Sequence, residues 1–407
     1  MSDRQKSIFI IISFIIFPLY TIPFIWINMY KGKNWAFVLW AIFMGLVGIL
    51  WPPTGDLYRY TQDFYSYKDI KFDDFLFLLS FKFDYLLSLI SYWLGHFDLN
   101  FDLTRFIYNF IGYLLLGNIY IKIIRKNSFL QTCKNRKILL VVFMTFSFSS
   151  FLFRFGLSTI LFVYGTYKIV YEKKYIGYLF VFFSVLNHAS FILLLLGLLI
   201  YQLGYFHFSK KMLSILVVLA LFTDSNLIIN SFYNLPLPIE IIDRYSAYFD
   251  GKWAGKYLDD KSWKYQLMQF LLNSFAYIYI ILYIYYYNKG NSNAQRVTNM
   301  LLMLSLITLP FITIHRRFLS ILSLLCKVYI LDSYSNKIVE QKILRLILSL
   351  VIFSTLMGVY SQRNELSISD MKKLTYQSTF QILFHSYDDK WIDKNITSDG
   401  DIVKFRM

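Results

Sequence analysis

Long apolar runs, separated by short polar or basic segments, extend over most of the 407-residue chain. Runs of this kind are typical of helices that cross the hydrocarbon core of a bilayer. We therefore predict an all-α polytopic membrane protein with about twelve transmembrane helices. The predicted spans are residues 7–30, 35–51, 101–124, 138–152, 155–171, 175–187, 190–206, 212–230, 265–287, 297–314, 318–333 and 343–360.

Three polar regions interrupt or follow this pattern. Within segment 52–100, the apolar run 75–95 is broken by charged residues. Charge at membrane depth is costly, so we predict an interfacial or re-entrant helix there. The loop 224–264 is long enough to form a lid over a site. These parts belong to one predicted membrane domain, residues 1–360, followed by a polar periplasmic tail, residues 361–407.

Basic residues indicate the orientation of the spans. The loop 125–137 has five lysines and arginines and no acid, as cytoplasmic loops do. Later basic loops alternate in step, which places both termini, segment 52–100 and loop 224–264 outside. Whether residues 75–95 span the membrane decides on which side the N-terminal segments lie. The net charge of +16 is then explained by cytoplasmic loops and does not indicate nucleic-acid binding.

Several common site types find no support in the sequence. Only two cysteines occur, Cys133 and Cys326, so neither a disulfide framework nor a thiolate metal site is expected. Phosphate-binding and dinucleotide-binding glycine patterns are missing, as is a GxSxG pattern. The acidic pattern at 399–401 is too short to indicate a metal site. The apolar N-terminus continues into a second span and lacks the pattern of a cleaved signal peptide. We expect no metal and no cofactor.

The stretch 51–67 is dense in groups that bind sugars and phosphates. Two prolines and a glycine end the preceding helix and force a turn. If a helix restarts at Asp56, this residue would be its N-cap, and Arg59 would share its face. The tyrosines that follow suit either stacking on sugar rings or an aromatic belt at the membrane interface.

Arg154 and His188 lie at two further outward helix ends. Apolar residues flank Arg154, where an arginine either reaches to the interface or faces a cavity and binds phosphate. His188 could be a packed imidazole, or it could act as base, acid or phosphate donor.

Arg316 and Arg317 follow His315 at a third outward end, with a basic interfacial anchor as the alternative. Arg244, in loop 224–264, is a weaker candidate of the same kind. Basic residues from distant parts of the chain would thus meet at one face, as a lipid-linked pyrophosphate requires. They are Arg59, Arg154, Arg244 and either Arg316 or Arg317.

Two local patterns resemble one family. Asp56-Leu57-Tyr58-Arg59-Tyr60 resembles the Asp-x-x-x-Tyr core of the EpsG family of bacterial exopolysaccharide proteins. Arg154-Phe155-Gly156-Leu157-Ser158, with His188-Ala189-Ser190 some thirty residues on, adds to the resemblance. The specific patterns cover about residues 50–190, and Phe155 departs from them, since a polar Gln is common there.

The resemblance implies a metal-independent membrane glycosyltransferase related to Wzy-type O-antigen and capsule polymerases, in the bacterial inner membrane. Such an enzyme transfers a growing glycan from undecaprenyl pyrophosphate to a new lipid-linked repeat unit at the periplasmic face. The implied fold is similar to that of the C-type glycosyltransferases. The expected partners are the lipid-linked oligosaccharide and membrane lipid, with a chain-length regulator as a further candidate.

Within this reaction, arginines would neutralise the departing pyrophosphate. The residues expected for that role are Arg154 with Arg316 or Arg317 and Arg59, and either His188 or Asp56 would take the acceptor's proton. The alternatives are a lipid-linked oligosaccharide flippase, a membrane acyltransferase that modifies sugars, and a structural membrane subunit. A flippase should show internal repeats and charges near the membrane midplane, whereas the charges here cluster at the predicted outer face.

Overall fold

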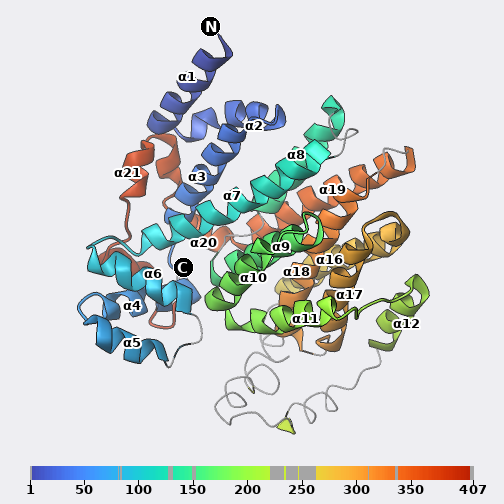
Figure 1. Ribbon diagram of the computed structural model, residues 1–407. Coiled ribbons are helices and arrows are strands. Elements are labelled where there is room, and N and C mark those ends of the chain that lie inside the picture. The colour runs from blue at the N-terminus through green and yellow to red at the C-terminus, as the bar shows by residue number, and fades with distance from the viewer. Residues whose placement is uncertain are drawn as a thin grey trace. The chain divides into compact units, whose positions relative to one another are not determined.

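The computed structural model describes residues 2–80, 82, 85–126, 132–148, 153–220, 233–234, 246, 263–309, 311–334 and 338–403. These residues are helical or irregular, and a single bridge joins Ile396 and Ile402 (Figure 1). The chain divides into two compact units. Unit 1 contains residues 1–168, 175–191 and 341–407, and unit 2 contains residues 169–174 and 192–340.

Unit 1 is built around two helices, α3 (Asn34–Ile49) and α7 (Asp102–Lys126). They run antiparallel, because Arg125 near the end of α7 donates to Asn34 Oδ1 at 3.0 Å, whereas Arg105 near its start donates to the carbonyl of Trp51. The other helices of this unit are α1 (Asp3–Ile16), α2 (Ile22–Tyr30), α4 (Asp56–Tyr67), α5 (Phe72–Ser80), α6 (Tyr85–His96), α8 (Cys133–Phe148), α9 (Arg154–Val170, up to Lys168), α10 (Ile176–Asn187), α19 (Ile338–Ser361, from Gln341), α20 (Arg363–Ile368), α21 (Thr379–Leu383) and α22 (Asp389–Asn395).

Different segments lie at the two ends of the antiparallel α3–α7 pair. At one end lie the α2–α3 turn, residues 31–33, and the last turn of α7, where the basic loop predicted to be cytoplasmic begins. At the other end lie the turn that leaves α3 and the start of α7. A helix of 16 residues, as α3 is, extends about 24 Å, so these ends are well separated.

Unit 2 contains α11 (Ile192–Gln202), α12 (Lys210–Ala220), α16 (Trp263–Tyr286), α17 (Ser292–Ile307) and α18 (Ile312–Asp332). Tyr283 of α16 is fully buried and donates to Asn299 Oδ1 of α17 at 2.8 Å. Its ring also meets the ring of Tyr329 of α18 edge-on. These contacts hold α16, α17 and α18 together.

Three predicted helix boundaries are wrong. The run 7–30 is two helices, because Phe17 precedes Pro18 and leaves the α conformation, which ends α1 at Ile16. The break predicted at 315–317 lies at 308–311, so α18 begins at Ile312. The third correction concerns segment 75–95.

The apolar run 75–95 forms a hairpin of two short helices, α5 and α6, where a single helix was predicted. The rings of Phe75 and Tyr92 stack at 4.3 Å between centroids. Lys82 lies in the connection, where its Nζ is 2.8 Å from Asp63 Oδ2 of α4. Neither helix has the roughly 20 residues that a span needs, and an interfacial or re-entrant position of this segment stays a prediction.

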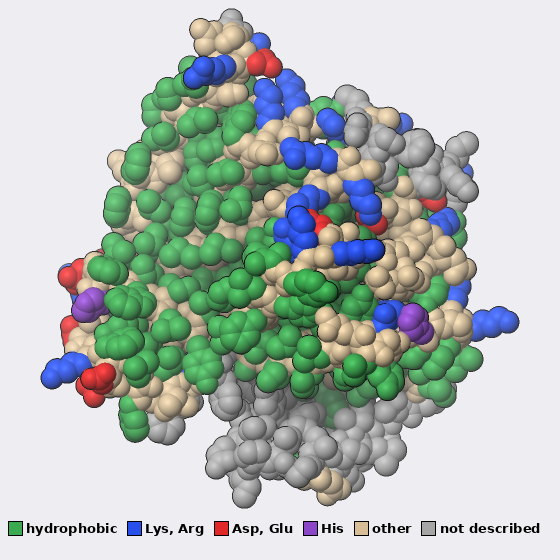
Figure 2. All heavy atoms as spheres, in the orientation of Figure 1, with side chains coloured by type: hydrophobic (Ala, Val, Ile, Leu, Met, Phe, Trp, Pro, Cys, Tyr) green, Lys and Arg blue, Asp and Glu red, His purple; other side chains and the backbone are tan. Residues whose placement is uncertain are grey.

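Exposed apolar side chains cover much of the surface of unit 1. Over α1 they include Phe9, Ile12 and Phe17, each about half exposed or more, and hydrophobic side chains form a broad field over the same part of Figure 2. An apolar surface of this extent is unusual for a soluble protein and suits contact with lipid.

Among the described residues, two helices are long and apolar enough to cross a membrane, Asp102–Lys126 and Glu340–Ser361. The helices Asn34–Ile49, Ile176–Asn187 and Ala189–Gln202 are apolar but shorter. The number of about twelve spans therefore stays a prediction.

Candidate functional site

Helix α4 starts directly after a tight turn, residues 51–55, which we call the α3–α4 turn. Gly55 is the N-cap of α4 and has φ +59°, a conformation that suits glycine. The prediction that Asp56 caps the helix is therefore wrong, and Asp56 is its first residue. Arg59 pairs with the Asp56 carboxylate on one exposed face, as the spacing predicts.

Arg154 is the first residue of α9, as predicted, and it lies against α4. Its guanidinium carbon is 4.4 Å from the ring centroid of Tyr60, within the range of a cation–π contact. The ring of Phe153 also stacks on the ring of Tyr60, with 5.3 Å between the centroids. The residues that follow Asp56 and Arg59 therefore pack directly on the start of α9.

His188 follows the last residue of α10, also as predicted. Its Nδ1 lies 2.8 Å from Ser190 Oγ, and its ring meets the ring of Phe155 edge-on. The preceding residue, Asn187, is fully buried and donates to the carbonyl of Arg154 at 2.7 Å. His188 is thereby held beside the start of α9.

Asn187 also joins this junction to the central helix α7. Its Oδ1 accepts from Tyr108 Oη at 2.6 Å, and its Nδ2 lies 2.9 Å from Ser158 Oγ. The structure thus brings α4, α9 and α10 of unit 1 together, with Arg154 against Tyr60 of α4 and His188 after the end of α10. Asp56 and Arg59 lie in the first turn of the same α4 helix. We call this the α4–α9–α10 junction.

The other predicted residues are placed differently. His315, Arg316 and Arg317 lie in the first turns of α18 in unit 2, so they are at a helix end, as predicted. The break between two spans that was predicted at these residues is wrong. His315 is buried there, with Nδ1 2.8 Å from the carbonyl of Ser305. Arg244 and most of the loop 224–264 lie outside the described residues.

A second polar cluster contacts the α3–α4 turn. None of its residues was predicted as a site residue from the sequence. Arg105 of α7 is almost fully buried and pairs with Asp102, one helical turn earlier. The same guanidinium donates to the carbonyl of Trp51. An arginine inside the predicted span 101–124 is the same signal that singled out Arg154, so the sequence could have indicated Arg105.

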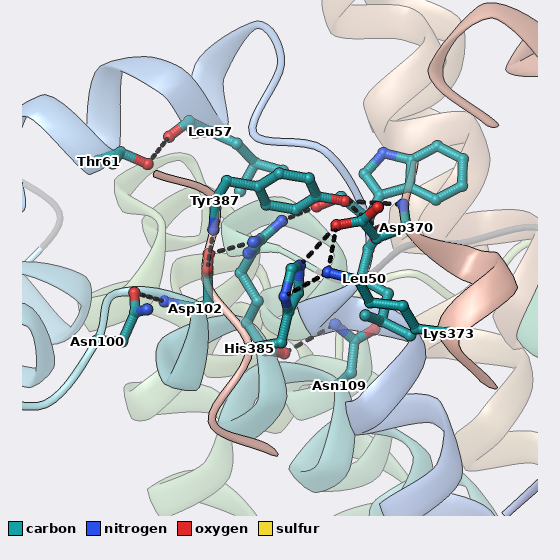
Figure 3. Close-up of polar contacts among 12 residues, drawn as sticks. Leu50, Leu57, Thr61, Asn100, Asp102, Asn109, Asp370, Lys373, His385 and Tyr387 are labelled. Atoms are coloured by element: carbon teal, nitrogen blue, oxygen red, sulfur yellow. Dashed lines mark hydrogen bonds and ion pairs between the residues drawn. The ribbon is translucent and has the colours of Figure 1, made fainter. Parts of the chain in front are cut away.

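The C-terminal segment completes this cluster (Figure 3). Tyr387 Oη donates to the carbonyl of Leu50 at 2.6 Å, and its backbone N–H points at Asp102 Oδ2 at 3.4 Å. Asp370 lies beside Lys373 at 2.8 Å and beside His385 Nε2 at 3.1 Å. No local pattern in the polar tail indicates these contacts.

The imidazole of His385 is enclosed by charged groups from several elements. Burial lowers its pKa, and the Lys373 ammonium, 3.1 Å from Nδ1, lowers it further. The Asp370 and Asp102 carboxylates oppose this change, while the Arg105 guanidinium adds to it. The resulting pKa of His385 lies below its usual value.

A shallow hollow of about 440 Å³ lies beyond the other end of α4. It is lined by residues that follow α4 and by one side of the α5–α6 hairpin, among them Lys68, Lys71, Trp93 and His96. Trp93 is about half exposed. Aromatic faces beside ammonium groups can contact both the ring of a sugar and its anionic substituents.

Metal ligation finds no support in the described part of the chain, where no group of three or more His, Cys, Asp or Glu side chains could hold an ion. The 399–401 acidic pattern lies in a turn whose Gly400 contacts Gly55. Metal independence stays a prediction.

Comparison with known proteins gives one match. The model of the EpsG family matches residues 33–378, which is most of the chain and includes α4, α9 and α10. No curated protein and no solved structure matches the chain.

Proposed function

The chain belongs to the EpsG family, whose members are Wzy-like polymerases, and we propose that it joins lipid-linked oligosaccharide repeat units into a polysaccharide. The family and the apolar helices identify a membrane protein with a polysaccharide polymerase-type function. The substrate and the steps below are our proposal. O-antigen, capsule and exopolysaccharide are all products of this class.

In the proposed reaction, a hydroxyl oxygen of a new lipid-linked repeat unit attacks the anomeric carbon of the growing glycan. The bond from that carbon to the pyrophosphate oxygen breaks, and undecaprenyl pyrophosphate leaves with the electron pair. The hydroxyl proton passes to a base. One glycosidic bond replaces one glycosyl–phosphate bond, so no further reactant is needed.

The α4–α9–α10 junction supports this chemistry with a cation and a titratable group. We propose that Arg154 binds the departing pyrophosphate. The edge of its guanidinium can donate two hydrogen bonds to phosphate while the group lies over the ring of Tyr60. We assign the proton to His188, whose ring type titrates near neutral pH. Asp56 pairs with Arg59, so we propose that Asp56 orients the Arg59 guanidinium, which is the second cation of the site.

The observation that carries the proposal is this convergence at one end of unit 1. Asn187 holds the backbone of Arg154 and precedes His188, and Tyr60 follows Arg59. The basic connections predicted to be cytoplasmic lie at the opposite end of α3 and α7. By the positive-inside rule, the junction then faces the periplasm across the bacterial inner membrane, in a multi-pass protein.

The hollow beside α5 and α6 suits the sugar part of the substrate. Helix α4 has 12 residues and so extends about 18 Å from Asp56 toward Lys68. A glycan of several sugars whose pyrophosphate binds at the junction could therefore reach Trp93 and Lys71. The α4 helix would form one wall of its path.

The test is complementation in a host that lacks the gene and otherwise makes the polymer. The deletion should leave a capped single repeat unit and no ladder of longer chains. Arg154→Ala should lower the rate of elongation on the order of 100-fold, the usual effect of removing one group that stabilises developing charge. His188→Ala should lower it by about 100-fold or more, as loss of a general base does.

Arg363→Ala is the matched control, because Arg363 also lies 4.4 Å over a tyrosine ring, that of Tyr360, and donates to the carbonyl of the same residue. It should restore a normal ladder. A normal ladder from both Arg154→Ala and His188→Ala would refute the assignment. Loss of the capped single unit in the deletion would instead identify a flippase.

A further inference from the structure

We propose that Tyr387 and Arg105 are positioning residues, which fix the α3–α4 turn and through it the start of α4. The catalytic consequence rests on the proposed function, whereas the structural consequence does not. Three backbone groups of the turn region have partners outside it. Leu50 O accepts from Tyr387 Oη at 2.6 Å and more weakly from the N–H of Asp370 at 3.3 Å. Trp51 O accepts from Arg105, and Gly55 N donates to Gly400 O at 2.7 Å.

The turn needs such partners because of its own sequence. The last carbonyls of a helix lack partners within the helix, and the two prolines at 52 and 53 have no N–H to supply them. Leu50 and Trp51 are buried, so solvent does not replace the missing donors. Tyr387 and Arg105 provide hydrogen bonds where the local chain cannot.

The donors are themselves held in place. Tyr387 Oη accepts from the N–H of Asp370 at 3.1 Å, which leaves its proton directed at Leu50 O. The ring of Tyr387 contacts that of Trp391 at 4.2 Å between centroids. Tyr58 of α4 packs against the same apolar cluster, so the C-terminal segment also contacts the helix itself.

The third contact admits only glycine. Gly400 has φ +83°, and a Cβ built on it would lie 2.8 Å from the carbonyl oxygen of Gly55. Distances below 3.0 Å require the backbone to move. The close approach of Gly400 to the residue before Asp56 therefore depends on the absence of a side chain.

A displacement of the α3–α4 turn would move the start of α4 and therefore the proposed site residues on it. Asp56 follows Gly55, and α4 carries Arg59 and Tyr60 as one rigid element. Misplacement of a reacting group by about 1 Å can cost on the order of 100-fold in rate. Tyr387 and Gly400 lie beyond residue 378, where the family match ends. We infer that this chain positions its α4 with a segment outside the matched region.

The test uses Tyr387→Phe, which removes one hydroxyl and keeps the ring. The full-length protein in lipid nanodiscs would be compared with wild type by amide hydrogen exchange, thermal unfolding and steady-state kinetics with lipid-linked repeat units. We expect exchange at residues 54–57 to be about tenfold faster, and kcat to fall about tenfold with KM within twofold. Exchange in the middle of α3 and α7 and the unfolding midpoint should remain at wild-type values.

Tyr376→Phe is the matched control, since Tyr376 lies in the same tail and is more than half exposed. It should behave as wild type. Gly400→Ala, which separates Gly400 from Gly55, should reproduce the Tyr387→Phe result. Unchanged exchange at 54–57 in both variants would overturn the inference.

Two further outcomes distinguish a positioning role of Tyr387 from a purely stabilising one, and its structural role from the proposed function. Exchange that rises equally throughout unit 1, with a lower unfolding midpoint and unchanged kcat, would reduce Tyr387 to a stabilising residue and contradict positioning. If the wild-type protein forms no polymer but Tyr387→Phe still speeds exchange at 54–57, the proposed function fails and the structural role of Tyr387 stands.

Discussion

Arg154 illustrates how one side chain can be both packed and able to bind an anion. Its guanidinium face lies on Tyr60, a contact worth about 0.5–2 kcal/mol, while phosphate is recognised by the guanidinium edge. Its backbone carbonyl is fixed by Asn187. The orientation of this residue therefore depends on two segments that are distant in sequence.

At this scale the sequence indicated some residues and missed others for physical reasons. The helix-end positions of Arg154 and His188 were predictable, because charged and polar groups at the ends of apolar runs are conspicuous. Arg105 carries the same signal but was overlooked inside a predicted span. Tyr387 was not predictable, because its partner Leu50 is more than 300 residues away and a tyrosine in a polar tail has no local pattern.

The lowered pKa of His385 predicts that the C-terminal segment is less stable at acidic pH. This pKa lies below the usual value, mainly through burial, so protonation favours the state in which this residue is released. The stabilisation is complete above the unfolded pKa of about 6.5 and is lost as pH falls through the folded value. Amide exchange of residues 379–403 should therefore rise between pH 7.5 and 5, after correction for the intrinsic pH dependence of exchange.

His385→Gln should remove most of this pH dependence, since glutamine can contact Lys373 and Asp370 without titrating. His207→Gln, a substitution in unit 2, serves as the control. An equal corrected rise in exchange in His385→Gln would show that another group is responsible.

At the scale of elements, hydrophobicity located the helices better than their breaks. The run 7–30 is continuously apolar, so only Pro18 marks the point where α1 ends. The charges near 75–95 mark the point where this run divides into two helices, and Lys82 lies in the connection between them. The hairpin itself depends on the stacking of Phe75 on Tyr92, a tertiary contact.

The contact of α9 with α10 leads to a prediction about stability. A Cβ on Gly165 would lie 2.5 Å from the backbone oxygen of Gly177, and a backbone atom cannot rotate away as a side chain can. Gly165→Ala should therefore destabilise the protein by about 1–3 kcal/mol, as overpacking does. Thermal unfolding in detergent would measure this, and the rate of elongation should fall because these helices carry Arg154 and His188.

Gly358→Ala provides the comparison, because nothing lies within 4 Å of a Cβ at that position of α19. It should leave the unfolding midpoint unchanged or raise it, since alanine favours a helix by up to about 1 kcal/mol over glycine. Equal midpoints for Gly165→Ala and wild type would contradict the close packing of α9 on α10.

At the scale of the whole molecule, the charge pattern predicts which end of the α3–α7 pair faces the cytoplasm, and this orientation stays a prediction. The basic connections meet at one end of the α3–α7 pair, and the α4–α9–α10 junction lies at the other. The return of the C-terminal segment to the α3–α4 turn was not predictable, because a polar, charge-balanced tail resembles a solvated extension. Its contact with α4 is made by Tyr387, Ile392 and Ile396, which pack around Tyr58.

We propose that the α4–α9–α10 junction transfers glycan between lipid carriers. The most direct measurement is made on the purified protein in lipid vesicles with a defined undecaprenyl-pyrophosphate-linked repeat unit. Glycan chain length and released undecaprenyl pyrophosphate would be followed together. We predict one released carrier for each glycosidic bond, with both products lost on the order of 100-fold in Arg154→Ala and retained in Arg363→Ala. Equal elongation by Arg154→Ala and wild type, or no elongation by the wild-type protein, would contradict the account.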